Sequence, residues 1–130
     1  MQFTSFLQEG KLTVALTGEI DHHRAKSYIS ANYHRDITVQ STADALHVDD
    51  RYLYNLFVKH ENTTPKKYID TCRIRAACEL LSRTEASITE IAVAVGFEGV
   101  SRFSRFFALH MGLSPTEYRK RHAPAPFLPG

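Results

Sequence analysis

The stretch SITEIAVAVGFEGVSRFSRFF, Ser87 to Phe107, carries two helix patterns separated by a glycine. Ser87 and Glu90 have the spacing of a capping box, in which two residues bond each other's backbone N–H groups at a helix start. Gly96 is expected to end that first helix. In the second pattern three phenylalanines recur at i, i+3 and i+4, which predicts one buried helix face. These phenylalanines are Phe103, Phe106 and Phe107.

The outer face of the second helix pattern has a different chemistry. Small serines allow a helix to approach another surface closely, and the planar donor fork of arginine suits guanine edges or phosphates. The alternative interpretation is an ordinary solvated face with two arginines. The residues that lie off the phenylalanine stripe are Ser101, Arg102, Ser104 and Arg105.

A weaker copy of this pattern lies earlier in the chain. Leu53, Leu56 and Phe57 stand 50 residues before the three phenylalanines. Each copy is a short helix, a tight turn and a longer amphipathic helix, which is the outline of a helix-turn-helix. In the major groove asparagine pairs well with adenine, and arginine pairs well with guanine. The outer face of the first copy carries Arg51, Tyr54, Asn55 and Lys59.

The residues around the two copies also indicate helices. Asp21 and Asp49 can each cap a helix, a short helix is predicted over 39–46, and Asn62 suits a left-handed helix end. Pro65 opens a long helix that runs to about Arg83. Its 19 residues give a length of roughly 28 Å, close to the roughly 34–36 Å between successive major-groove faces of B-DNA. Any protein with two helical lobes needs a spacer, so this match is suggestive only.

The two ends of the chain differ from each other. Residues 3–9 and 12–17 read as two short strands joined at Gly10-Lys11, which predicts a β-hairpin. The tetrapeptide SPTE at 114–117 repeats the capping pattern and predicts a last helix.

We therefore expect a mainly α fold, with two helix-turn-helix subdomains joined by a long linker helix and preceded by the hairpin. The expected boundaries are 1–20 for the hairpin leader, 21–122 for the helical domain, about 37–62 and 84–121 for its lobes, about 65–83 for the linker, and 123–130 for a flexible tail.

Composition limits the possible partners. The chain has 130 residues, a net charge of +2, 43% hydrophobic and 23% charged residues, as in ordinary globular domains. A nucleic-acid partner would therefore need the positive charge concentrated on one face. No stretch approaches the roughly 20 apolar residues of a membrane span, and the first residues do not resemble a signal peptide. Cys72 and Cys78 are too far apart on one helix for a disulfide, so we expect a cytoplasmic protein.

Patterns typical of enzymes are absent from the sequence. There is no glycine-rich phosphate loop, no nucleophile elbow and no convergent pair of carboxylates. The seven histidines are not at ligand spacing to each other or to the cysteines. We expect no catalytic activity, no metal site and no cofactor.

Residues from about 25 to 121 resemble the DNA-binding domain of the AraC/XylS family of bacterial transcription regulators. The frame that carries the resemblance is Ile91-Ala92, Gly96-Phe97, the phenylalanines around Ser104-Arg105, Gly112, Pro115 and Tyr118-Arg119. The resemblance implies seven helices, with two helix-turn-helix units that bind adjacent major grooves of double-stranded DNA. The base-edge candidates that it implies are Arg51, Tyr54 and Asn55 in the first unit, and Val100, Ser101, Arg102, Ser104 and Arg105 in the second.

Some positions depart from this family pattern. Thr42 stands where an apolar residue is usual, Asn62 replaces a common glycine, and Ala108 replaces a frequent basic residue. The sensory or dimerisation domain of most members is absent from this sequence. The chain therefore resembles the small stand-alone members, which bind DNA as monomers in the bacterial nucleoid. Such members often activate transcription through contact with RNA polymerase.

A second resemblance concerns the start of the chain. Residues 12–26, LTVALTGEIDHHRAK, resemble the opening strand and helix start of the STAS domains of anti-sigma-factor antagonists. The serine loop that is phosphorylated in that family has no counterpart here. The alternative function is accordingly a protein-interaction module of the sigma-factor regulatory type, acting through the N-terminal segment.

Overall fold

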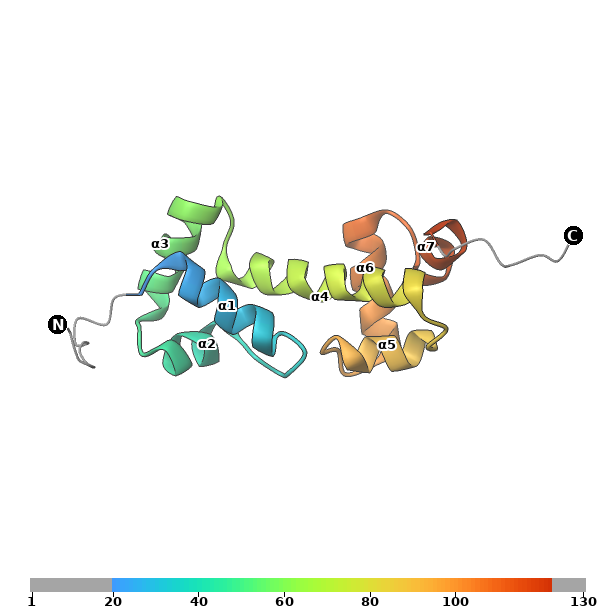
Figure 1. Ribbon diagram of the computed structural model, residues 1–130, viewed down its shortest axis with the longest axis horizontal. Coiled ribbons are helices and arrows are strands. Elements are labelled where there is room, and N and C mark those ends of the chain that lie inside the picture. The colour runs from blue at the N-terminus through green and yellow to red at the C-terminus, as the bar shows by residue number, and fades with distance from the viewer. Residues whose placement is uncertain (1–19, 123–130) are drawn as a thin grey trace, which may run out of the picture. The chain divides into compact units, whose positions relative to one another are not determined.

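The computed structural model describes residues 20–122, in which the regular secondary structure is α-helix and there are no strands. The mainly α prediction is confirmed for these residues, whereas the predicted hairpin strands and the tail at 123–130 lie outside them. The seven helices, shown in Figure 1, are α1 (His22–Asn32), α2 (Val39–Leu46), α3 (Asp50–Glu61), α4 (Pro65–Arg83), α5 (Ile88–Ala94), α6 (Val100–Met111) and α7 (Pro115–His122).

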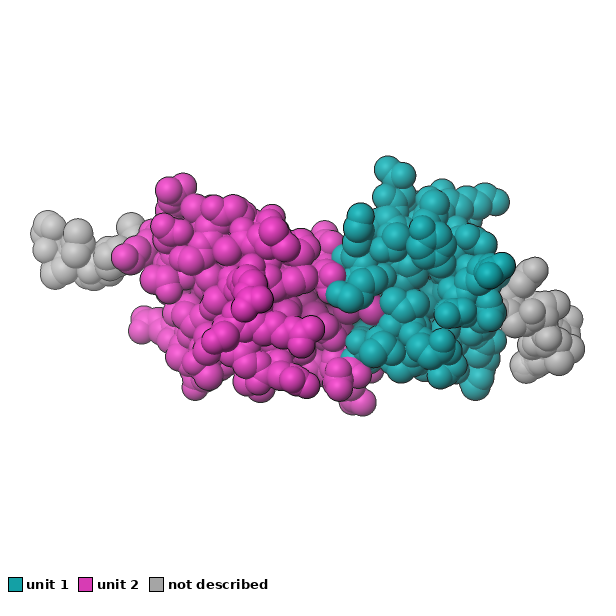
Figure 2. Space-filling model, turned by 180° about the vertical axis from the view of Figure 1, so that it is seen from behind, with its two compact units in different colours: residues 1–31, 37–68 teal, residues 32–36, 69–130 magenta. Residues whose placement is uncertain are grey.

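The chain divides into two compact units, which Figure 2 shows in different colours. Among the described residues, unit 1 contains residues 20–31 and 37–68, and unit 2 contains residues 32–36 and 69–122. The division after Tyr68 falls inside α4, so this one helix contributes residues to both units. Each unit holds one helix-turn-helix, α2–α3 in unit 1 and α5–α6 in unit 2.

Reciprocal side-chain caps start two of the helices as the sequence predicted. Glu90 accepts a bond from the Ser87 N–H at 2.8 Å, and the Ser87 hydroxyl accepts one from the Glu90 N–H at 3.0 Å. Ser114 and Glu117 repeat the arrangement at the start of α7, with both distances at 3.1 Å. These bonds satisfy N–H groups that have no partner within the helix.

The start of α2 has a capping box that the sequence pattern did not reveal. Thr38 is the N-cap and Ser41 takes the place of the usual Glu or Gln, with distances of 2.9 and 3.0 Å. The departure at Thr42 is also accommodated here, because its fully buried hydroxyl donates to the Thr38 carbonyl at 2.7 Å. A buried hydroxyl with a good acceptor has no large desolvation penalty. The hydroxyl of Thr42 is therefore compatible with a buried position in this lobe.

In unit 1, α2 packs against α3. The start of α1 is tied to α3 by Tyr52, whose hydroxyl donates to the Ile20 carbonyl at 2.8 Å and accepts from the Ile20 N–H at 3.3 Å. The described buried side chains of this unit are Ala25, Ile29, Thr42, Ala43, Leu46, Leu53, Phe57 and Pro65.

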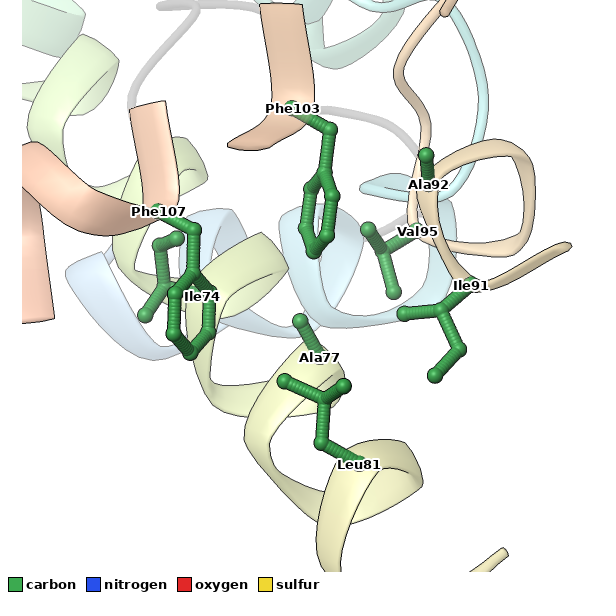
Figure 3. Close-up of a cluster of buried hydrophobic side chains, with 8 residues drawn as sticks. All are labelled: Ile74, Ala77, Leu81, Ile91, Ala92, Val95, Phe103 and Phe107. Atoms are coloured by element: carbon green, nitrogen blue, oxygen red, sulfur yellow. The ribbon is translucent and has the colours of Figure 1, made fainter. Parts of the chain in front are cut away.

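Unit 2 is built around the two phenylalanines of α6 that are fully buried, Phe103 and Phe107. Figure 3 shows both rings pointing toward α4, with the side chains of α5 beside them. Phe106 was expected on the same buried face but is only partly buried, because it lies at the edge of the stripe. Its ring packs against Phe97, 5.2 Å between centroids, rather than entering the cluster. The buried cluster consists of Ile74, Ala77, Leu81, Ile91, Ala92, Val95, Phe103 and Phe107.

Candidate nucleic-acid interface

The two helix-turn-helix turns have the same hydrogen-bond pattern. The Val48 N–H donates to the Ala43 carbonyl at 3.0 Å, and 49 residues later the Phe97 N–H donates to the Ala92 carbonyl at 2.9 Å. In each turn the residue just before the N–H donor has a positive φ. This residue is His47 (φ 60°) in the first turn and Gly96 in the second. The repeat that the sequence suggested is thus present in the backbone geometry of both turns.

The turn of the second helix-turn-helix requires glycine at position 96. Its φ is +103°, which L side chains rarely adopt, and an added Cβ would lie 2.8 Å from the Tyr33 carbonyl oxygen. It would also lie 3.0 Å from Nε of Arg73. The segment 32–36 of unit 2 therefore packs closely on this turn.

Arg73 fastens that segment. Its Nε donates to the Tyr33 carbonyl at 2.8 Å, its Nη2 donates to the Arg35 carbonyl at 2.9 Å, and its guanidinium lies 5.9 Å from the centroid of the Phe97 ring. Burial lowers the pKa of Arg73, and the charges of Asp70 and Asp36 oppose that shift. Sequence reasoning missed this arginine, although it stands among the inner positions of α4. Two of its donors are engaged by backbone carbonyls of this segment, so Arg73 positions the turn.

The outer face of α6, defined as Val100, Ser101, Arg102, Ser104 and Arg105, follows directly after this turn. Ser101, Arg102 and Arg105 are exposed, whereas Val100 and Ser104 are half-buried. Among residues 20–122, no hydrogen bond or ion pair engages the side chains of the serines or arginines of this face. Two guanidinium groups are thus available to an external partner near the start of the helix.

The outer face of α3, defined as Arg51, Tyr54, Asn55 and Lys59, is exposed at all four positions. The side chains of this face likewise have no hydrogen-bond or ion-pair partner within the described part of the chain. Asp49 was expected to cap the helix rather than to oppose an anionic ligand, and its carboxylate does accept the Arg51 backbone N–H at 3.0 Å. The first turn of α3 also contains Asp50.

Sequence reasoning missed Val58 as part of this surface. Val58 is 44% exposed and lies one helical turn after Tyr54, which is 49% exposed. The sequence signal was present, since Tyr54 and Val58 are four residues apart and each follows a residue of the buried stripe, Leu53 and Phe57. The surface of α3 is therefore apolar at these two positions, whereas the corresponding positions of α6 are Ser104 and Ala108.

Arg119 fixes α7 to the end of α4 within unit 2. Its Nε donates to the Leu81 carbonyl at 3.0 Å and its Nη2 donates to the Thr84 carbonyl at 3.1 Å. The adjacent Tyr118 packs edge-on against Phe107, with ring centroids 5.5 Å apart. Residues that the sequence pattern marked only as a family motif thus hold the last helix in place.

Tyr118 is also paired with Cys78, and this pair predicts a loss of stability at alkaline pH. Burial raises the pKa of the Cys78 thiol, partly offset by a hydrogen bond with Tyr118. The pKa of Tyr118 is raised by burial first and then by its interactions with Cys78. The folded chain therefore keeps these protons to higher pH than the unfolded chain, in which a thiol titrates near about 8.5.

The contribution of this pair to the free energy of unfolding should thus not change with pH below about pH 8. It should be lost as the pH rises through the raised pKa values. We expect the fall in the free energy of unfolding to be shallower in Cys78→Ala than in the unaltered chain. Urea unfolding followed by circular dichroism at several pH values from neutral to about 10 measures it. Equal pH slopes in the two proteins would show that the pair does not contribute.

The histidines do not form a metal site in the described residues. His22 stacks on His60 with ring centroids 4.4 Å apart, and its Nε2 lies 3.7 Å from a carboxylate oxygen of Glu61. Even so, no group of three or more His, Cys, Asp or Glu side chains within residues 20–122 is placed to hold a metal ion. None of the helices in the same part of the chain is both long and apolar enough to cross a membrane.

Comparison with known proteins points to one family. Residues 42–121 match a family model described as a helix-turn-helix domain. The lactose operon transcription activator of Staphylococcus xylosus is 34% identical over 99 residues, covering 76% of this chain and 36% of that protein. Two solved structures, each 31% identical to this chain, share its fold. The C-terminal domain of AraT, a response regulator from Geobacillus stearothermophilus, has a TM-score of 0.78 over 82% of this chain and 89% of that one. A transcriptional regulator with an AraC-type DNA-binding domain from Chromobacterium violaceum has a TM-score of 0.71 over 81% and 93%.

Coverage is uneven between the two kinds of relative. The chain spans about a third of the length of the curated relatives, 36%, 35% and 31% for three of them. Nothing in these comparisons supports the STAS resemblance of residues 12–26. Most of those residues lie outside the described part of the chain, as does most of the segment on which the alternative function depended.

Proposed function

The chain belongs to the AraC family of helix-turn-helix transcription regulators, and from that premise we propose that it binds double-stranded DNA by placing α3 and α6 in adjacent major grooves. The family is one of transcription regulators and not of enzymes. Sequence recognition would come from the outer faces of the two helices. The lobes would be residues 37–62 and 84–121, with residues 65–83 as the linker.

One observation carries this proposal. Two helices of twelve residues each follow turns of the same hydrogen-bond pattern, and each presents an outer face whose polar side chains have no partner among residues 20–122. Arginine and asparagine are the side chains that pair most specifically with purine edges in the major groove. The buried aromatic residues on the opposite side of each helix hold that face outward.

The role of the whole protein follows from the same relatives. We propose that it activates transcription, as the name of the Staphylococcus xylosus relative states for that protein. Contact with RNA polymerase and binding as a monomer, in the cytoplasm, belong to the same proposal. Two unequal helix-turn-helix units in one chain support monomeric binding, because one copy already supplies two surfaces for two grooves.

DNA binding is tested by mobility shift with promoter fragments. Affinity should fall about a hundredfold between about 50 and 200 mM salt if about four phosphates are contacted, because bound counterions are released. The absence of retardation at any salt concentration, in a chain that circular dichroism shows to be folded, would overturn the proposal.

Arg105→Ala tests the contribution of one residue. Its loss should cost about 1–3 kcal/mol at one base position and leave the affinity for other sequences nearly unchanged. Arg105→Lys is the matched control, because lysine keeps the charge but lacks the donor fork. If the alanine variant weakens binding to all sequences equally and the lysine variant restores it, Arg105 contacts only a phosphate.

A further inference from the structure

We propose that the two helix-turn-helix units select different bases at the same structural position, adenine through Asn55 and guanine through Arg105. The target would then be an asymmetric site, with an A·T-containing half under α3 and a G·C-containing half under α6. This inference rests on the proposed DNA binding and specifies the class of sequence that is bound.

The equivalence of the two positions comes from the backbone and the core. α3 and α6 have the same length, and both end at a residue with positive φ, Asn62 and Gly112. Leu53 and Phe103 are fully buried at the fourth position of each helix. With the two helices in this common register, residue 55 corresponds to residue 105.

The side chains at equivalent positions differ in hydrogen-bonding capacity. The Asn55 amide offers one donor group and one acceptor, which matches the N6 amino group and N7 of adenine. The Arg105 guanidinium offers only donors, which match O6 and N7 of guanine. Both side chains are exposed, and neither has a hydrogen-bond or ion-pair partner within residues 20–122.

Neighbouring positions strengthen the contrast. On α3, Tyr54 and Val58 are 49% and 44% exposed, and such apolar surface suits the C5-methyl group of thymine. Their counterparts on α6 are Ser104 and Ala108, which are smaller and half-buried. A thymine in a base pair next to the adenine, on either strand, would therefore be favoured under α3. The same preference is not expected under α6.

The equivalent residues Tyr52 and Arg102 also differ in the donors that they offer to a base. The Tyr52 hydroxyl donates its only hydrogen to the Ile20 carbonyl and accepts from the Ile20 N–H, so it has no donor left for a base. Arg102 is exposed and has no bond to a described residue, which adds a second guanidinium to the α6 surface. Arg51, at the start of α3, is the single arginine of the first surface.

The test is selection of bound duplexes from a random library, with the unaltered chain and with Asn55→Arg and Arg105→Asn. The unaltered chain should enrich a site with an essential adenine in one half and an essential guanine in the other. Asn55→Arg should change the adenine to guanine at that one position, and Arg105→Asn should change the guanine to adenine in the other half. Each exchange should alter the preference at its own position by about tenfold or more, as a lost bidentate pair does.

Deoxyuridine in place of thymine probes the methyl contact separately. Its incorporation in the α3 half-site should weaken binding severalfold, and incorporation in the α6 half-site should not. Tyr54→Ala and Val58→Ala together should abolish this difference while the protein stays folded by circular dichroism.

The outcomes distinguish a failure of DNA binding from a failure of the base assignment. If no sequence is enriched by the unaltered chain, the proposed function fails. If a sequence is enriched but both exchanges leave every base preference in place, or if the two half-sites have the same sequence, DNA binding stands and this inference is wrong.

Discussion

Phe103→Ala should lower the free energy of unfolding of unit 2 by about 3–5 kcal/mol, the usual cost of emptying a buried aromatic site. The ring is fully buried and belongs to the cluster between α4, α5 and α6. It also contacts two neighbouring rings, Phe107 at 5.7 Å and Phe97 at 5.4 Å between centroids. The same ring orients the outer face of α6, so specific DNA binding should be lost together with stability.

Leu109→Ala is the matched control for this prediction. It removes a large side chain from the same helix, but this side chain is 80% exposed and should contribute less than about 0.5 kcal/mol. Urea titration followed by far-UV circular dichroism measures both variants. Equal effects of the two substitutions would mean that the α6 aromatic face does not form the core of unit 2.

Gly96→Ala should destabilise the chain by about 2–4 kcal/mol, through a strained backbone and a collision. The φ of +103° disfavours any L side chain, and the new Cβ would meet the Tyr33 carbonyl oxygen at 2.8 Å. That oxygen is held in place by the 2.8 Å bond from Arg73, so the segment cannot simply move aside. We expect the turn to shift and α6 to lose its position relative to α5.

Substitutions at two other glycines separate the effect of backbone strain from the effect of the collision. Gly112 also has a positive φ, +76°, but an added Cβ there meets no atom within 4 Å, so Gly112→Ala should show backbone strain alone, about 1 kcal/mol. Gly99 is extended, with φ −153° and open space, and Gly99→Ala should cost less than about 1 kcal/mol. Thermal unfolding of the three variants should therefore rank Gly96 as the most sensitive. A Gly112→Ala variant as unstable as Gly96→Ala would rule out the contact with Tyr33 as a cause.

Local signals made most helix ends predictable. Asp49, Ser87 and Ser114 cap the helices that follow them, and Asn62 adopts the left-handed conformation expected at a helix end. Each of these features depends on residues two to four positions apart, so the sequence contains all of its partners. The helix at 39–46 was predicted, but the capping box at its start was not, because Ser41 takes the place of the usual Glu or Gln.

The outer faces of α3 and α6 were predictable for the same reason, because helical periodicity places them opposite the buried stripe. The partial burial of Val100 and Ser104, and the exposure of Val58 beside Tyr54, depend on neighbours that periodicity does not report. Which of these residues contact DNA stays a prediction.

The helices, most of their caps and the two repeated turns could be predicted, because these features depend on spacing along the chain. The contacts that hold the second turn could not be predicted, since Arg73 reaches carbonyl groups 40 and 38 residues earlier in the chain. Arg119 likewise reaches 38 and 35 residues back to fasten α7. Every residue has a backbone carbonyl, so the sequence does not show which carbonyl a distant arginine binds. The fold thus gives Arg73 and Arg119 structural roles, while the arginine side chains on the outer faces of α3 and α6 have no partner within residues 20–122.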